Sequence, residues 1–214
     1  EFQKMDIEYK GGNSLIISSK DGTIFVDAKT SVVGRKDLNT NNSTELATEE
    51  RLALNNPEAK VSIESPGEFE TDGFVIRGTA AKRHVDTDED GLKSTIYSIK
   101  RGDIRLAIVG NIDAKLSDDQ LESIGVVDIL ILPVGGGGLT LDAMSAKAIV
   151  SSIDPKVVIP VHYADPKLKY EVPQEGVEAF IKELGAPVEE TNKYKVKPGA
   201  VFNENLLVVK LNLS

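Results

Sequence analysis

The sequence predicts a mixed α/β fold in which two β-sheets stack face to face and helices cover the outer faces. Short apolar segments separated by turn residues fill the first half of the chain, whereas helical and strand patterns alternate in the second half. No Pro- or Ser-rich linker separates the halves, so we expect residues 1–214 to form a single domain. Residues 1–4 are expected to be a tag remnant or disordered.

The first half reads as antiparallel strands joined by tight turns. Alternating apolar segments fill residues 5–27, and they are broken at 11–13 and 20–22, where Gly, Asn and Asp adopt positive φ angles at little cost. Gly102 and Asp103 form a similar turn further on. Further strands are expected at residues 61–63, 74–77, 95–99 and 104–109.

A loop and a helix are expected between these strands. Residues 34–44 are polar and rich in turn formers, which is typical of a surface loop. Residues 45–54 predict a helix, with Asn42 as N-cap and Glu45 as its partner in a capping box.

The second half alternates helices with buried strands. Ser117 and Gln120 form a capping box at the start of a helix over 117–124. Two more helices are expected at 142–151 and 173–184, the last with a Pro near its start and Gly185 past its end. Continuous apolar runs at 127–132 and 156–159 are typical of buried strands, and strands at 196 and 206–211 close the chain.

Composition excludes several classes of function. The net charge of −9 gives no basic surface for nucleic acid or anionic lipid, so neither partner is expected. There is no cysteine, and His84 and His162 are the only histidines, so zinc sites built from clustered histidines or cysteines cannot form. No apolar run approaches the ~20 residues of a membrane span, and no signal peptide pattern is present, so we expect a cytoplasmic protein.

Several sequence blocks resemble the metallo-β-lactamase superfamily, and within it the small UlaG-like "Zn-dependent hydrolase" branch. The blocks are SPGEFE (65–70), TIYSIK (95–100), VDILILPVGG (127–136), TLDA (140–143) and KVVIPVHYADP (156–166). The resemblance covers nearly the whole chain. It implies an αββα sandwich of two mixed sheets, with a metal site at the edge that the sheets share.

The chain departs from this family at the metal ligands. The family's H-x-H-x-D-H motif should stand between residues 27 and 65, where no histidine occurs, and its Gly-Asp pair is Gly110-Asn111 here. The resemblance matches His84 to the family's middle histidine and His162 to its last one. If these two hold a single Zn or Mn ion, the helpers would be Asp27, Asn111, Asp165 or Asp86.

Three hypotheses about function stay open. The missing ligands favour a protein that has no metal cofactor and no hydrolase activity. Such a protein would serve as a scaffold, form a homo-oligomer, or bind a protein partner or a small ligand. The alternative is a metal-dependent hydrolase of a phosphoester, lactone or amide bond with a reduced mononuclear site. The third is a binder of small anions, in which backbone N–H groups of Gly135, Gly136, Gly137 and Gly138 form a cradle between a buried strand and a helix.

An acidic segment resembles half of a calcium loop. Asp86, Asp88 and Asp90, followed by Gly91, match D-x-D-x-D-G, but position twelve is Tyr97 where the loop needs a bidentate Glu. This pattern favours a solvated acidic loop over a weak Ca²⁺ or Mg²⁺ site.

Overall fold

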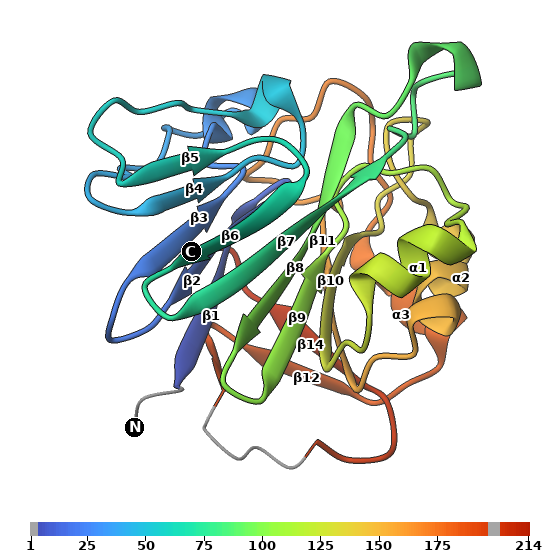
Figure 1. The fold of residues 1–214 in the computed structure, drawn as a ribbon. Helices are drawn as coiled ribbons and strands as arrows, with labels where there is room; N and C mark the ends of the chain where they lie inside the picture. Colours follow the sequence, from blue (N-terminus) through green and yellow to red (C-terminus); the bar gives the residue numbers. More distant parts are fainter. Residues whose placement is uncertain (1–3, 197–201) are drawn as a thin grey trace.

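The computed structural model describes residues 4–196 and 202–214 as two β-sheets stacked face to face (Figure 1). Residues 1–3, which belong to the expected tag remnant, lie outside the described residues. The smaller sheet has the order β13-β1-β2-β3-β4-β5. Its strands are β1 (Met5–Gly11), β2 (Ser14–Ser18), β3 (Thr23–Val26), β4 (Thr44–Leu46), β5 (Val61–Ile63) and β13 (Tyr194–Val196).

The larger sheet has eight strands in the order β12-β14-β11-β10-β9-β8-β7-β6. Strands β6 to β9 pair antiparallel, whereas β9, β10, β11, β14 and β12 run parallel. The strands are β6 (Gly67–Thr71), β7 (Phe74–Ala81), β8 (Ser94–Arg101), β9 (Ile104–Ile108), β10 (Ile129–Pro133), β11 (Val157–Val161), β12 (Val188–Thr191) and β14 (Leu207–Leu211).

The core lies between the two sheets and between the larger sheet and the helices. Strand β1 alternates buried and half-buried residues, so it presents one face to the core, as the alternating sequence predicts. Strands β10 and β11 are buried along their whole length because helices cover their outer side (Figure 1). The predicted mixed α/β sandwich is confirmed.

Within residues 4–196 and 202–214, three α-helices pack on the outer face of the larger sheet: α1 (Asp118–Ile124), α2 (Ala143–Ile153) and α3 (Val177–Leu184) (Figure 1). The predicted capping box of α1 is confirmed, since the Ser117 hydroxyl accepts from the Gln120 backbone N–H at 3.1 Å. Helix α3 begins later than predicted. Residues 173–175 instead pack against the loop that follows β10, where the Glu175 backbone N–H donates to the Gly135 carbonyl at 2.8 Å.

The helix predicted over 45–54 is wrong. The segment forms strand β4 and a short 3-10 turn, η2 (Glu50–Leu52). Strand β4 lies in the middle of a parallel trio with β3 and β5, and the φ angle of Asn42 is +55°, which an N-cap does not adopt. The helical pattern is local, and pairing with two neighbouring strands overrides it. Two further 3-10 turns are η1 (Thr30–Val33) and η3 (Asp88–Asp90).

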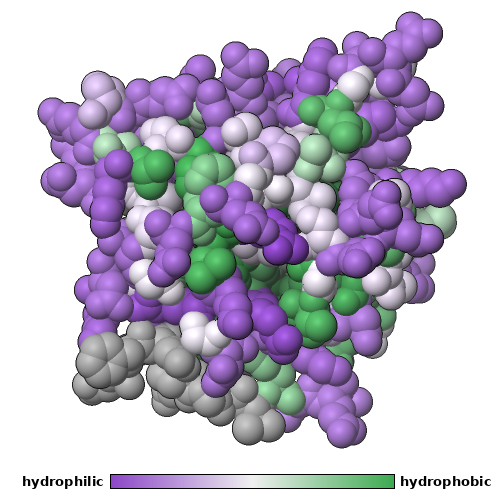
Figure 2. All heavy atoms as spheres, in the orientation of Figure 1, coloured by the Kyte–Doolittle hydropathy of each residue, from purple (hydrophilic) through white to green (hydrophobic). Residues whose placement is uncertain are grey.

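The surface drawn in Figure 2 is mostly hydrophilic, with apolar residues gathered in small groups. In the part of the chain that the structure describes, no helix has both the length and the apolar character needed to cross a bilayer.

Candidate functional site

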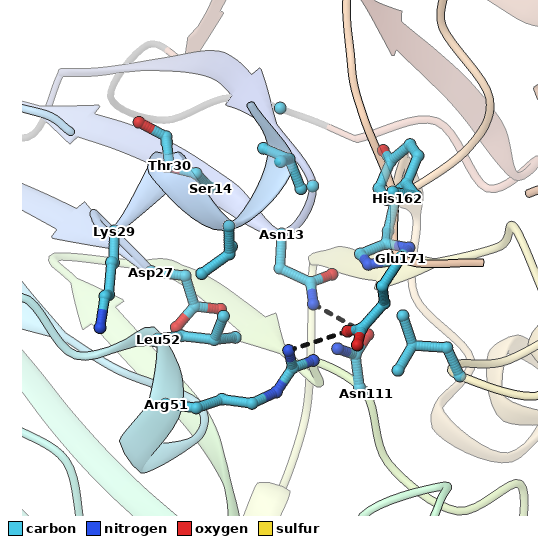
Figure 3. A pocket seen from close by; sticks show the side chains of 16 residues that line it. Asn13, Ser14, Asp27, Lys29, Thr30, Arg51, Leu52, Asn111, His162 and Glu171 are labelled. Carbon is cyan, nitrogen blue, oxygen red and sulfur yellow. Dashed lines mark hydrogen bonds and ion pairs between the residues drawn. The ribbon is translucent and has the colours of Figure 1, made fainter. Parts of the chain in front are cut away.

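A small cavity lies where loops from both sheets meet at one end of the sandwich (Figure 3). Asn13 follows β1, Asp27 follows β3, Asn111 comes shortly after β9, and His162 follows β11. Arg51, in η2, lines the same cavity. About 20 Å³ is open to the centre of a water molecule, which is room for about one water. The structure thus brings Asp27, Asn111 and His162 together.

The backbone at this site is held in unusual conformations. Asp27 and His162 have φ angles of +49° and +53°, in the left-handed region that non-glycine residues seldom adopt. Gly110, at φ +59°, has no room for a side chain, because a Cβ there would lie 2.9 Å from Thr48. Backbone strain of this kind concentrates at functional sites, which makes the loops around this cavity a candidate site.

Asp27 is buried and hydrogen-bonded to one residue of the neighbouring strand connection. Its Oδ1 accepts from the Thr48 backbone N–H and its Oδ2 accepts from the Thr48 hydroxyl, both at 2.7 Å. Burial raises the pKa of Asp27 to about 7, and the two hydrogen bonds from Thr48 oppose that rise. Each oxygen of this carboxyl therefore already accepts one hydrogen bond from Thr48.

A chain of buried side chains crosses the site. The Asn13 amide donates to Asn111 Oδ1 at 2.9 Å (Figure 3), and the Asn111 amide donates to Glu49 Oε1 at 3.2 Å. All three side chains are buried. An aspartate at position 111, as in the family pattern, would instead place a second carboxylate beside Glu49.

Glu49 ends this chain against two guanidinium groups. Its Oε2 lies 3.0 Å from Arg51 Nε and 3.6 Å from Arg83 Nη1. Arg51 also reaches Glu171 Oε1 at 3.1 Å, at the mouth of the cavity (Figure 3). Burying the Glu49 carboxylate without these cations would cost several kcal/mol, on the order that unpaired buried ions show. Arg51 therefore brings a permanent positive charge into the site.

His162 is buried and neutral near pH 7. Its Nδ1 lies 2.8 Å from Gln174 Oε1, which can only accept, so the proton sits on Nδ1 and Nε2 keeps its lone pair. The His162 backbone N–H donates to the Tyr9 hydroxyl at 3.2 Å and to the Gly12 carbonyl at 2.9 Å. Burial lowers the pKa of His162 to about 4.

His84 does not line this cavity. Its backbone N–H donates to the Asn111 carbonyl at 2.9 Å, and its buried Nδ1 has no hydrogen-bond partner among the described residues. Its electrostatic neighbours are Asp113 and Asp142. Both histidines therefore lie near Asn111, but in different ways. The His84 backbone bonds to the Asn111 backbone, whereas His162 lines the same cavity as Asn111.

The other carboxylates named from the sequence have their own partners. Asp86 forms a two-pronged ion pair with Arg83, with both distances 2.7 Å. Asp88 pairs with Lys82 at 2.9 Å, and Asp90 accepts from the Thr87 backbone N–H at 2.8 Å. Asp165 accepts from the Lys167 backbone N–H at 2.8 Å within its own turn.

The glycine loop packs against residues 173–174. A Cβ on Gly135 would lie 2.3 Å from the His162 carbonyl, and one on Gly137 would lie 2.5 Å from the Pro173 carbonyl. Gly136 donates its N–H to the Leu141 carbonyl at 2.9 Å, whereas Gly138 is exposed with nothing near it. The glycines are required here mainly because the neighbouring backbone comes so close.

The donor atoms at this site do not fit a metal ion. Catalytic zinc sites keep three protein ligands and one open position. Within residues 4–196 and 202–214, no group of three His, Cys, Asp or Glu side chains is arranged to hold a metal. The oxygens of Asp27 and Glu49 are already bonded to protein groups, and the Arg51 guanidinium lines the cavity that a cation would need.

Sequence reasoning did not identify Glu49, Arg51 and Gln174 as site residues. Glu49 and Arg51 fall within the helix expected over 45–54, which does not form, and Gln174 falls within the helix expected over 173–184, which begins only at Val177. One sequence feature pointed toward Glu49 and Arg51: no histidine occurs between residues 27 and 65. Other side chains of that segment must therefore fill the space that the family's ligands occupy.

Comparisons with known proteins agree with this fold. Residues 6–162 match the family described as beta-lactamase superfamily domain. A candidate Zn-dependent hydrolase of the metallo-β-lactamase superfamily from Thermotoga maritima has a similar structure, with a TM-score of 0.76, 23% identity, and coverage of 97% of this chain and 98% of that chain.

Two further structures are similar at lower identity. A candidate metal-dependent hydrolase from Parabacteroides distasonis gives a TM-score of 0.67 at 14% identity, covering 98% of this chain and 94% of that one. A metallo hydrolase from the archaeon Ignicoccus hospitalis gives 0.60 at 16% identity, covering 85% and 91%. No curated protein matches the sequence. Because the family match spans more than half of the sequence and the sandwich is shared, this chain belongs to the metallo-β-lactamase superfamily.

Proposed function

We propose that this chain is a non-catalytic member of its superfamily, a binding or scaffold protein whose site is closed by its own side chains. The observation that carries the proposal is the buried series Asn13, Asn111 and Glu49, which ends on the half-exposed Arg51. Each side chain in the series contacts the next through one polar group, so protein groups hold these residues in place without an ion.

Metal-assisted hydrolysis needs an ion with an open position, where bound water becomes a nucleophile near neutral pH. The residues near the cavity supply one imidazole nitrogen, on His162, together with carboxylates that protein donors already hold. His162 is a weak base because burial lowers its pKa to about 4. The Asp27 carboxyl, whose pKa is raised to about 7, is already held by two hydrogen bonds from Thr48.

Turnover measurements test this proposal. Phosphodiester, lactone and amide substrates are incubated with the protein after chelator treatment, and again after addition of zinc or manganese. We expect rates equal to those of a matched Arg51→Gln, His162→Ala control in every condition. Turnover that needs an added metal and is lost in His162→Ala would overturn the proposal and favour a reduced mononuclear hydrolase.

A further inference from the structure

The polar groups around the cavity are not all satisfied, although the site is closed. Asn13 Oδ1 and Ser14 Oγ are buried and have no hydrogen-bond partner among the described residues. The two residues are 5% and 2% exposed, and both line the cavity. Buried polar atoms are seldom left unpaired, so these two call for a partner inside the cavity.

The unsatisfied atoms define the chemistry of that partner. Asn13 Oδ1 accepts only, and His162 Nε2 is an acceptor because Nδ1 carries the proton toward Gln174. Two acceptors need a donor such as a hydroxyl group. The space of about 20 Å³ accommodates one group of that size.

Arg51 supplies the complementary charge at the mouth. Its Nη1 already holds a carboxylate of this chain, that of Glu171, at 3.1 Å (Figure 3). Both partners reach solvent, with side chains 37% and 61% exposed, so water competes with the pair and Glu171 is easily displaced. The second contact of Arg51, to buried Glu49, holds the guanidinium in place when Glu171 leaves.

We propose that Arg51, Asn13 and Ser14 form a binding site for a small hydroxy-carboxylate, and that Glu171 is a built-in competitor that closes the site. The carboxylate of the ligand replaces that of Glu171 on Arg51. Its hydroxyl enters the cavity, where it donates to Asn13 Oδ1 or His162 Nε2 and accepts from Ser14. This inference rests on the proposed function, since it assigns a ligand to a site without a metal.

Titrations with glycolate and acetate test the site in chelator-treated protein. Glycolate carries the hydroxyl and acetate lacks it, and chloride at equal ionic strength is the reference. Binding is followed through the arginine Nε–H resonances and the melting temperature in Glu171→Ala, with Glu178→Ala, an exposed glutamate outside the cavity, as the matched control. We expect Glu171→Ala to bind glycolate about tenfold more tightly than acetate, and more tightly than wild type or the control.

Second substitutions in the Glu171→Ala background locate the contacts. Adding Arg51→Gln abolishes binding of both acids, and adding Ser14→Ala lowers the affinity for glycolate toward that for acetate. No binding beyond chloride, binding that survives Arg51→Gln in a folded protein, or equal affinity for the two acids would each overturn the inference. If Arg51→Gln does not fold, the test rests on the smaller Ser14→Ala change, and an unchanged preference for glycolate over acetate in that variant would overturn the inference. Zinc content is measured on the same samples, so retained metal would contradict the proposed function independently of glycolate binding.

Discussion

The Asn13 side chain donates a hydrogen bond of 2.9 Å to Asn111 across 98 residues of sequence, and it thereby joins the edges of the two sheets at the candidate site. The contact depends on an amide at position 111, since Asn111 both accepts from Asn13 and donates to Glu49. An aspartate could make the first contact but would repel the second partner.

Asn111→Asp should therefore destabilise the protein although it restores the residue of the family pattern. The new carboxylate lies beside buried Glu49, and a lost hydrogen bond with an uncompensated charge costs about 2–4 kcal/mol. The free energy of unfolding is measured in urea. Asn203→Asp, at an exposed position, is the control and should change it little. A fully stable Asn111→Asp variant would show that the site has room for a second charge.

Asp27 should make the protein less stable as the pH rises from about 4 to 7. Its folded pKa of about 7 lies above the ordinary aspartate value of 3.8, so between these values the folded state binds more protons than the unfolded state. The contribution is complete below pH 3.8 and is lost as the pH passes through 7. Asp27→Asn keeps an acceptor for the Thr48 N–H and removes the titrating group. The free energy of unfolding of this variant, relative to that of wild type, should therefore increase between pH 4 and pH 7, by at most about 4 kcal/mol. Urea midpoints at pH 4 and pH 7.5 that shift equally in both proteins would refute this account.

His162 should behave in the opposite sense. Its folded pKa of about 4 lies below the ordinary histidine value of 6.5, so the stability that it contributes is present above pH 6.5 and is lost as the pH falls through 4. NMR of the imidazole nitrogens should show a neutral ring protonated on Nδ1 at pH 6. Gln174→Glu places a carboxylate beside the Nδ1 proton of His162 and should raise the pKa of His162. A charged imidazole in wild type at pH 6 would contradict the burial argument.

The two ion pairs of Arg51 should differ in strength. Glu171 is largely exposed, so Glu171→Ala should cost about 0–1 kcal/mol. Arg51→Met also removes a cation from Glu49, whose side chain is 3% exposed, and should cost about 3 kcal/mol. Equal losses in urea denaturation would mean that Arg83 alone satisfies Glu49.

Much of the fold could be predicted from the sequence, because alternation and capping are local signals. The capping box at Ser117 and the buried runs that form β10 and β11 are of this kind. The stretch TELATEERL misled because its helical period is local, whereas its pairing with β3 and β5 depends on residues far along the chain.

The site could be predicted only in part for the same reason. Asn111 and His162 are predicted from family positions and Asp27 as a possible helper, and all three line one cavity. Arg51 lines the cavity and Glu49 contacts Asn111 behind it, because the segment around η2 lies beside the loop after β9. No local pattern contains this relationship between distant segments.

The central claim is that protein groups occupy the place of a metal centre, and metal content tests it most directly. The purified protein is loaded with zinc or with manganese, desalted, and analysed for bound metal, with His162→Ala measured in parallel. The account predicts far less than one ion per chain, with no difference between the two proteins. Retention of one ion or more per chain, lost in His162→Ala, would contradict it.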